Sequence, residues 1–404
     1  MKMEAVAVER GFSPEPAVFA GDPEWLAALR RAAFARFEEV GFPGGKDEAW
    51  RYTRLQPITE ASWRRVRREP AVAASLPEGV RVRKLSEAPV SAEPALGGIA
   101  SFEKSAFTAL NTALFENGLL VEILPGAVVA DPIDIVFDAG AAPTPEVSYP
   151  RVLVLAGERS EASIVETYTG AGRNFTNGVT EIALRPGALL EHTKLQEESE
   201  TACHVHTLAV RQERGSRFTS HNVALGAALA RTELSVVLAG EGAECALYGL
   251  FVGRGRQHLD NRTLIDHALP HGSSRELYKG VMDGASRGVF HGTIIVRPDA
   301  QKTDAVQTNK NLLLSREALV NSTPALEIFA DDVKCKHGST TGQLDAAALF
   351  YLRSRGIGEP EARALLTWAF AADVAERIRV PRVRRRVERE LGVRLAAPGS
   401  EEAA

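Results

Sequence analysis

The sequence contains only three cysteines, Cys203, Cys245 and Cys335, and no Cys-x-x-Cys pair. An odd number of cysteines without this spacing is typical of a reducing compartment and excludes a self-contained zinc or ferredoxin-type site. No stretch approaches 18 apolar residues, and residues 1–10 alternate charge with alanine and valine, unlike a signal peptide. We therefore expect a cytoplasmic protein that does not enter a membrane.

An excess of charge of one sign is also absent. The 404 residues carry a formal net charge of −4, with 25% charged and 45% hydrophobic residues, the values of an ordinary soluble protein. The one dense basic run, Arg379 to Arg386, is offset by glutamates farther along the tail. This balance disfavours nucleic acid or an anionic membrane as a partner.

Common catalytic motifs are missing as well. Gly44-Gly45-Lys46 lacks the first glycine of a phosphate-binding loop and is followed by Asp47. Gly253-Arg254-Gly255-Arg256 has neither the third glycine nor the following helix of a dinucleotide site. No G-x-S-x-G or H-E-x-x-H occurs. We expect a chain that is not an enzyme and does not hydrolyse nucleotides by itself.

What is present, from Leu119 onward, is a series of short apolar or alternating runs separated by Gly, Pro, Asn and Asp. Turn-then-strand units recur 27 to 31 residues apart, at Gly126, Gly157, Gly187, Gly215 and Gly242. The helical stretches that a βαβ arrangement requires between strands are missing. A sandwich, a barrel and a β-solenoid remain, and the regular spacing favours the solenoid without excluding a sandwich.

Helical periodicity appears on both sides of this region. We expect an N-terminal helical and mixed region over residues 1–118, a β-helix core over 119–342 and a C-terminal helical region over 343–404. The C-terminal helices could dock a partner or pack on the β-body, and both alternatives stay open. Trp50-Arg51-Tyr52-Thr53 is either a recognition patch or, more often for aromatic residues beside a helix end, a packing anchor.

The segment from Asp331 to Gly342 joins the β-region to the helical tail. If it is extended, Cys335 and His337 share one face of the strand. A sulfur and an imidazole are candidate metal or iron–sulfur ligands, but two are too few, so a site here would be open or shared with another chain. Alternatively, Cys335 and Val333 point into the core, where free cysteine behaves as a small apolar side chain.

Two other segments contain histidines that could either form a site or have a structural role. His204 and His206 share a strand face and could chelate a metal, although such pairs are more often solvated. The polar run from His258 to His271 suggests a site, but turns between coils with hydrogen-bonded side chains are the more common interpretation.

Several segments between Leu277 and Ile357 closely resemble the SufB/SufD family of the SUF iron–sulfur cluster assembly system. They include Leu277-Tyr278-Lys279-Gly280-Val281, Gln307-Thr308-Asn309-Lys310-Asn311, Asp331 to Gly338, and Leu349 to Gly356. The Asp-Asp-Val-Lys-Cys-x-His-Gly form at Asp331 is similar to the SufD branch, as is Trp50-Arg51-Tyr52-Thr53. The cysteine that the SufB branch carries near the position of Ala318 has no counterpart here.

This resemblance implies a right-handed parallel β-helix between helical ends. It further implies a non-catalytic scaffold that pairs with SufB through the β-helix and binds the ATPase SufC through the C-terminal helices. His337, with Cys335 as a second candidate, would contribute to a shared iron–sulfur site at the SufB interface. A nascent cluster would be held in the assembled complex and none stably by the chain alone.

The resemblance leaves three points open. A reduced flavin is associated with the assembled complex in this family, but this chain has no flavin fingerprint. In isolation, without SufB, the chain could form a homodimer. The second function class is a β-solenoid enzyme acting on polysaccharides, which would need acidic or basic residues clustered along a groove.

Overall fold

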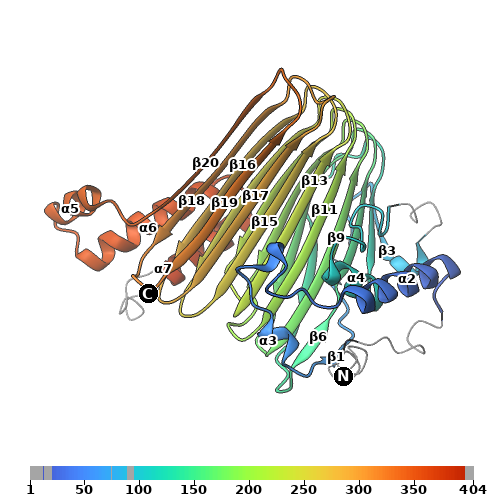
Figure 1. Cartoon of the computed structure of the whole chain (residues 1–404), viewed down its shortest axis with the longest axis horizontal. Helices are drawn as coiled ribbons and strands as arrows, with labels where there is room; N and C mark the ends of the chain where they lie inside the picture. Colours follow the sequence, from blue (N-terminus) through green and yellow to red (C-terminus); the bar gives the residue numbers. More distant parts are fainter. Residues whose placement is uncertain (1–11, 13–20, 74, 89–94, 396–404) are drawn as a thin grey trace.

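Successive strands of the chain alternate between two long sheets, which together form a parallel β-solenoid with helices at both ends (Figure 1). The computed structural model describes residues 12, 21–73, 75–88 and 95–395. Sheet A contains β1 (Arg64–Arg65), β3 (Val80–Lys84), β4 (Leu119–Ile123), β6 (Glu146–Ser148), β7 (Arg151–Ala156), β9 (Asn174–Leu184), β11 (Cys203–Gln212), β13 (Leu229–Leu238), β15 (His258–His267), β17 (Arg287–Val296) and β19 (Leu319–Ile328). Sheet B contains β2 (Ala71–Val72), β5 (Ile133–Asp138), β8 (Glu161–Thr169), β10 (Leu189–Gln196), β12 (Arg217–Ala224), β14 (Glu244–Gly253), β16 (Ser273–Met282), β18 (Asp304–Leu313) and β20 (Lys334–Gly342). The predicted solenoid is confirmed, and the sandwich alternative is wrong.

The solenoid forms because each coil stacks apolar side chains directly on those of the next. The strands from β9 to β17 in sheet A are parallel and in register, so one inward column runs through Ile182, Val210, Val236, Ile265 and Ile294, all buried. Between coils, glycines such as Gly187 (φ 70°) and Gly215 (φ 64°) take left-handed turn conformations that disfavour other residues. The spacing of these glycines in the sequence therefore records the length of one coil.

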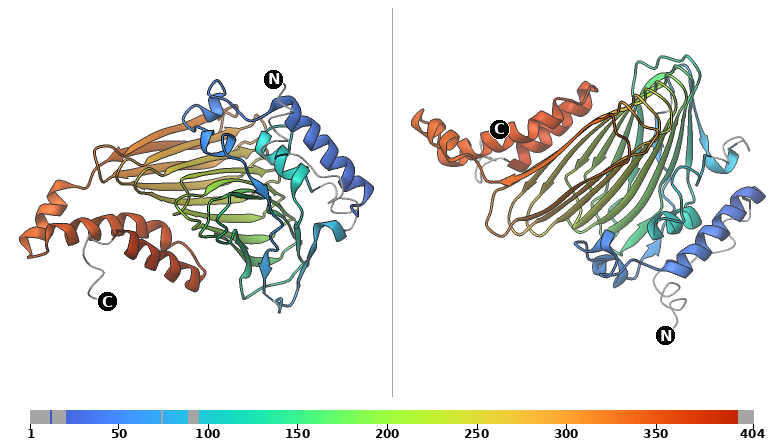
Figure 2. Two further views of the ribbon diagram at one scale, coloured as in Figure 1. Left: turned by 90° about the horizontal axis from the view of Figure 1, so that it is seen from below. Right: turned by 45° about the horizontal axis from the view of Figure 1, so that its top comes forward.

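The N-terminal helices α2 (Glu24–Val40) and α4 (Ala106–Leu114) lie beside the first coils of sheet A, with the short helices η2 (Glu48–Trp50), α3 (Gln56–Thr59) and η3 (Leu85–Glu87) around them (Figures 1 and 2). Trp50 is buried and lies over the guanidinium of Arg231, whose Cζ is 3.7 Å from the ring centroid. The Thr53 hydroxyl donates to Asp260 Oδ2 at 2.6 Å. The packing interpretation of this motif is thus confirmed for Trp50 and Thr53.

The C-terminal helices α5 (Ala346–Ser354), α6 (Glu359–Ala375) and α7 (Pro381–Leu395) divide between the two alternatives raised above. The second half of α6 and α7 pack on the outer face of sheet B, where Val374, Ile378 and Val387 cover Val223 and Leu250. By contrast, α5 has no buried residue, and it extends with the start of α6 beyond the last strands (Figures 1 and 2). The alternative in which the helices pack on the β-body is therefore confirmed for α7, whereas α5 is free to contact another molecule.

The two ends of the solenoid differ. At the N-terminal end, β3 pairs antiparallel with β4 and β2 with β5, and helices α2 and α4 lie near β3 (Figure 1). At the other end, β19 and β20 are the last strands of their sheets, and no described strand pairs with their outer edges. Their residues are mostly half-buried or exposed, unlike those of the preceding coils. No helix within the described ranges is long and apolar enough to span a bilayer.

Candidate functional site

The candidate ligands Cys335 and His337 lie on β20, at the open end of the solenoid. Cys335 stands opposite Ala305 of β18, and its half-buried side chain packs against the interior apolar cluster. Because alternate residues of a strand share a face, His337 also projects from the interior side. It is exposed because no coil follows β20. The structure brings the two residues to one uncapped surface that another molecule could reach.

This position limits what the two residues can bind by themselves. Among the residues that the structure describes, no group of three or more His, Cys, Asp or Glu side chains is arranged to hold a metal ion. Burial raises the pKa of the Cys335 thiol, which keeps it protonated at neutral pH unless a metal or a positive group approaches. A complete ligand set at this end would need donors from another molecule.

Polar side chains form the floor behind His337. Gln307 of β18 stands opposite His337, and Glu276 of β16 stands opposite Gln307, so the three occupy one inward column. Gln307 Nε2 donates to Glu276 Oε2 at 2.7 Å, and both side chains are buried. Burial raises the pKa of Glu276 to about 7, although its contacts with Thr263 and Gln307 act in the opposite direction. A carboxyl group with a pKa of about 7 therefore lies two strands below the open surface, on β16.

A second group of polar side chains borders the open end, beginning at Ser339, two residues after His337 on β20. The Ser322 hydroxyl donates to Asn309 Oδ1 at 2.7 Å, and Ser322 and Ser339 lie 2.7 Å apart through their hydroxyl oxygens. Asn311 Nδ2 donates to Asn309 Oδ1 at 2.6 Å and to Thr341 Oγ1 at 3.3 Å. These bonds join β19 to β20 and fix the side chains around the exposed end.

The pair His204 and His206 lies inside the solenoid and is fully buried, so the expectation of solvated histidines is wrong. Their rings stack with centroids 5.9 Å apart, and His204 Nδ1 is 2.8 Å from Glu198 Oε2. Burial lowers the pKa of both imidazoles, and the nearby Lys194 ammonium lowers them further. The two rings are thus neutral interior groups.

These histidines belong to a buried polar cluster that the sequence analysis missed. Glu166 accepts from the Tyr168 hydroxyl at 2.8 Å and from the Thr180 hydroxyl at 2.9 Å, and His192 Nε2 is 3.2 Å from its Oε1. Burial alone would raise the pKa of Glu166, but these neighbours hold it below its usual value. Burial lowers the pKa of Lys194 to about 7. The sequence shows that polar residues alternate in these strands, but it does not show which of the two strand faces points into the solenoid.

The first part of the polar run from His258 to His271 forms strand β15 (His258–His267), so the prediction of turns is wrong there, whereas His271 lies in the turn before β16, as predicted. Its side chains are hydrogen-bonded, as expected: His267 Nε2 is 2.9 Å from Ser274 Oγ, and Asp266 binds Arg297. The structure does not bring its histidines into contact with Cys335 or His337. The run is therefore part of the solenoid wall.

His267 makes the stability of the solenoid depend on pH. Burial lowers the pKa of its imidazole to about 4, although Asp266 acts in the opposite direction. The unfolded chain takes up this proton near pH 6.5, so the folded state binds fewer protons between pH 6.5 and 4 and loses stability as the pH falls through this window. From pH 7 to pH 5 we expect this residue to lower the free energy of unfolding by about 2 kcal/mol.

Urea unfolding at pH 7 and pH 5 checks this prediction, with His267→Gln as the variant that cannot titrate. The variant is less stable already at pH 7, because it loses the contact between His267 Nε2 and Ser274 Oγ. It should nevertheless lose about 2 kcal/mol less than the natural chain between the two pH values. Equal losses in both proteins would show that His267 is not held neutral by burial.

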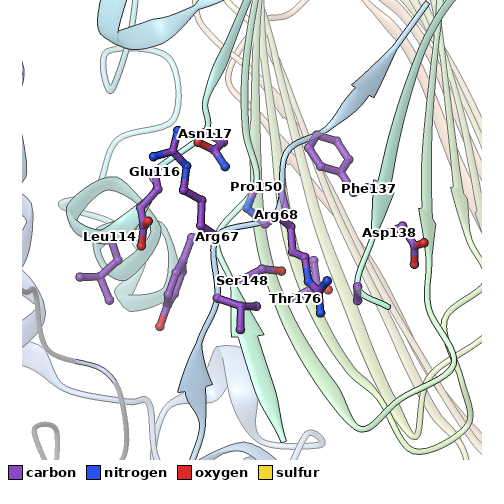
Figure 3. Close-up of a pocket in the computed structure, with 13 residues that line it drawn as sticks. Arg67, Arg68, Leu114, Glu116, Asn117, Phe137, Asp138, Ser148, Pro150 and Thr176 are labelled. Carbon is purple, nitrogen blue, oxygen red and sulfur yellow. The ribbon is translucent and has the colours of Figure 1, made fainter. Parts of the chain in front are cut away.

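Two hollows elsewhere on the molecule differ in size and character. A groove of about 790 Å³ lies between the start of α7 and the first residues of the sheet B strands. Its acids and bases pair with one another, as in Arg217–Glu244 at 3.2 Å and Arg379–Glu191 at 3.8 Å. Figure 3 shows a cavity of about 20 Å³ near the N-terminal end, lined by Arg68 and Asn117 among others. That volume suits one or two water molecules.

Comparisons with known proteins identify the family of this chain. Residues 137–370 match the family model described as SUF system FeS cluster assembly, SufBD core domain. An iron–sulfur cluster assembly SufBD family protein of Synechocystis is 36% identical over 67% of this chain and 62% of its own length. Iron-sulfur cluster assembly protein SufD of Escherichia coli is 32% identical over 88% of this chain and 90% of its own length. A SufBD family protein of Mycobacterium leprae is 32% identical over 91% and 96% of the two chains.

The fold and the position of Cys335 and His337 define a class: a parallel β-solenoid with candidate cluster ligands on an uncapped end. Within that class the chain belongs to the SufBD family of iron–sulfur cluster assembly proteins and is of the SufD type. The resemblance found in the sequence is thereby confirmed. The ligand roles of Cys335 and His337 stay predictions.

Proposed function

We propose that this chain is a non-catalytic scaffold subunit that builds a nascent iron–sulfur cluster together with SufB. The observation that carries the proposal is the exposure of His337 on an edge strand whose outer backbone groups have no partner among the described residues. A SufB subunit would pair with the ends of both sheets and add the ligands that this chain lacks. The cluster is the cargo of the complex, which passes it on to recipient proteins.

The backbone at this end favours such pairing. Lys334 N–H donates to Thr303 O, so residues 334, 336, 338 and 340 bond toward β18 while the alternate residues direct their backbone groups outward. Unpaired edges of this length readily accept another strand. Apolar side chains are exposed beside them, including Leu319, Ile328 and Phe329. A second copy of the chain could use the same edge when SufB is absent.

The C-terminal helices supply the second interface, for which we propose the ATPase SufC. Phe350 and Tyr351 of α5 are 74% and 56% exposed, and Leu365 and Trp368 of α6 are also exposed. Aromatic residues of this kind are the usual anchors of a protein interface. The cytoplasm is the compartment that we propose, because the three cysteines are free.

His337→Ala tests the function. We expect the full complex with SufB and SufC to assemble normally but to retain at least tenfold less iron–sulfur cluster after anaerobic incubation with Fe²⁺ and sulfide. Bound iron, acid-labile sulfide and visible absorbance measure the outcome. His271→Ala is the control, because His271 is exposed on the turn between β15 and β16 and does not belong to the column of Glu276, Gln307 and His337. Full cluster retention by His337→Ala would overturn the proposed site, and a stable cluster on the isolated chain would overturn the shared one.

A further inference from the structure

Gln307 is the buried residue directly behind His337. Its side chain is 1% exposed and points into the solenoid in the column shared by Glu276 and His337. Neighbouring strands of a sheet lie about 4.8 Å apart, so the amide is within reach of a side chain on the next rung.

Glu276 fixes the orientation of the Gln307 amide. Gln307 Nε2 donates to Glu276 Oε2 at 2.7 Å, so the carboxyl oxygen is the acceptor of this bond. The amide nitrogen is therefore committed to Glu276, and the amide oxygen is left for another partner. That atom, Gln307 Oε1, is buried and has no hydrogen-bond partner among the described residues. A buried acceptor without a donor is rare and costly in a native protein.

Gly292 of β17 leaves the space that this amide occupies. A Cβ at position 292 would lie 2.4 Å from Gln307 Nε2 and 2.8 Å from Phe290 Cζ. Any side chain at this position would displace the end of Gln307. The amide is thus held between a glycine on one sheet and a carboxylate on the other.

We propose that Gln307 is a positioning residue for His337: its free Oε1 accepts the N–H of one ring nitrogen of His337. A neutral imidazole has one donor nitrogen and one acceptor nitrogen, so the other nitrogen then carries its lone pair toward the open end. Histidines that ligate metals usually donate their second nitrogen to such an acceptor. This inference rests on the proposed function, because it assigns the support of the same site.

Gln307→Met tests the inference, because methionine fills similar space without the acceptor oxygen. We expect the complex with SufB and SufC to form but to retain about tenfold less cluster after incubation with Fe²⁺ and sulfide. The ring ¹⁵N shifts of His337 in the cluster-free chain should also change toward a mixture of the two tautomers. A purely structural role would leave these shifts unchanged.

The matched control is Gln212→Met, on β11. Gln212 is also fully buried and also has an Oε1 without a partner among the described residues, but it lies coils away from the open end. It should lower the melting temperature as much as Gln307→Met does and leave cluster retention intact. Gly292→Ala keeps Gln307 but displaces its amide, so it should reproduce the tautomer change.

The outcomes separate the two proposals. If Gln307→Met and Gly292→Ala keep normal cluster and normal His337 shifts while His337→Ala loses the cluster, the positioning role is overturned and the proposed function stands. If His337→Ala also keeps the cluster, the proposed site itself is overturned. Equal cluster loss in Gln212→Met and Gln307→Met, with unchanged His337 shifts, would reduce Gln307 to a folding role and overturn the inference.

Discussion

Replacing Arg231 with methionine is expected to lower the free energy of unfolding by about 3 to 5 kcal/mol. Arg231 is fully buried, pairs with the buried Asp260, donates to the Ala49 carbonyl at 3.0 Å and lies against the Trp50 ring. Its loss leaves the Asp260 carboxylate buried without its charged partner, which costs more than the pair contributed. Urea unfolding followed by circular dichroism measures the change.

The same substitution should release the segment around Trp50 from the solenoid, because Ala49 and Trp50 lose their shared contact. Limited proteolysis near residue 50 would detect this release before global unfolding. Arg211→Met is the control, since Arg211 is an exposed outward residue of the neighbouring strand β11. It should change stability by less than about 0.5 kcal/mol. A similar small effect for Arg231→Met would contradict the role assigned to the buried pair.

Removing both aromatic rings of α5, by Phe350→Ala and Tyr351→Ala, is expected to weaken SufC binding at least thirtyfold, about 2 kcal/mol. The two side chains are exposed and α5 buries none of its residues on this chain. The substitutions should therefore leave the melting temperature unchanged while affinity falls. Isothermal titration of SufC into the full chain measures the change.

Val128→Ala is the control for this experiment, because Val128 is 72% exposed but lies between β4 and β5, at the opposite end of the solenoid from β20, which leads into α5. It should bind SufC normally. Unchanged binding by the doubly substituted chain would move the ATPase interface away from α5. Weaker pairing with SufB instead of SufC would reassign these aromatic residues to the solenoid-end interface.

The solenoid was predictable because its turns carry a signal that needs no tertiary information. Backbone sterics favour glycine at the left-handed turn position, and glycine occupies it in consecutive coils at Gly187, Gly215 and Gly242, whereas His271 and Lys302 take the same conformation in the coils that follow. Strand boundaries were less accessible. His258–His267 was interpreted as turns because its charged residues hide the alternating strand pattern. Leu259 and Ile265 belong to that pattern and point into the core.

The candidate site was predictable only in part. The shared face of Cys335 and His337 follows from strand geometry, and their place at an open end follows from the helical sequence after Gly342. Gln307 and Glu276 are 30 and 61 residues before His337, and only the register of β16, β18 and β20 places them in one column. Register between coils depends on the length of each turn, which a single sequence does not state.

Only Gln343, Leu344 and Asp345 connect strand β20 to helix α5. A fully stretched linker of this length spans about 14 Å from Gly342 to Ala346. If the ATPase carries α5 farther than this during its cycle, tension reaches β20 and detaches its last residues from β18. Mechanical work done on the helix would then open the strand that carries Cys335 and His337, and a longer linker would absorb the pull and uncouple the two.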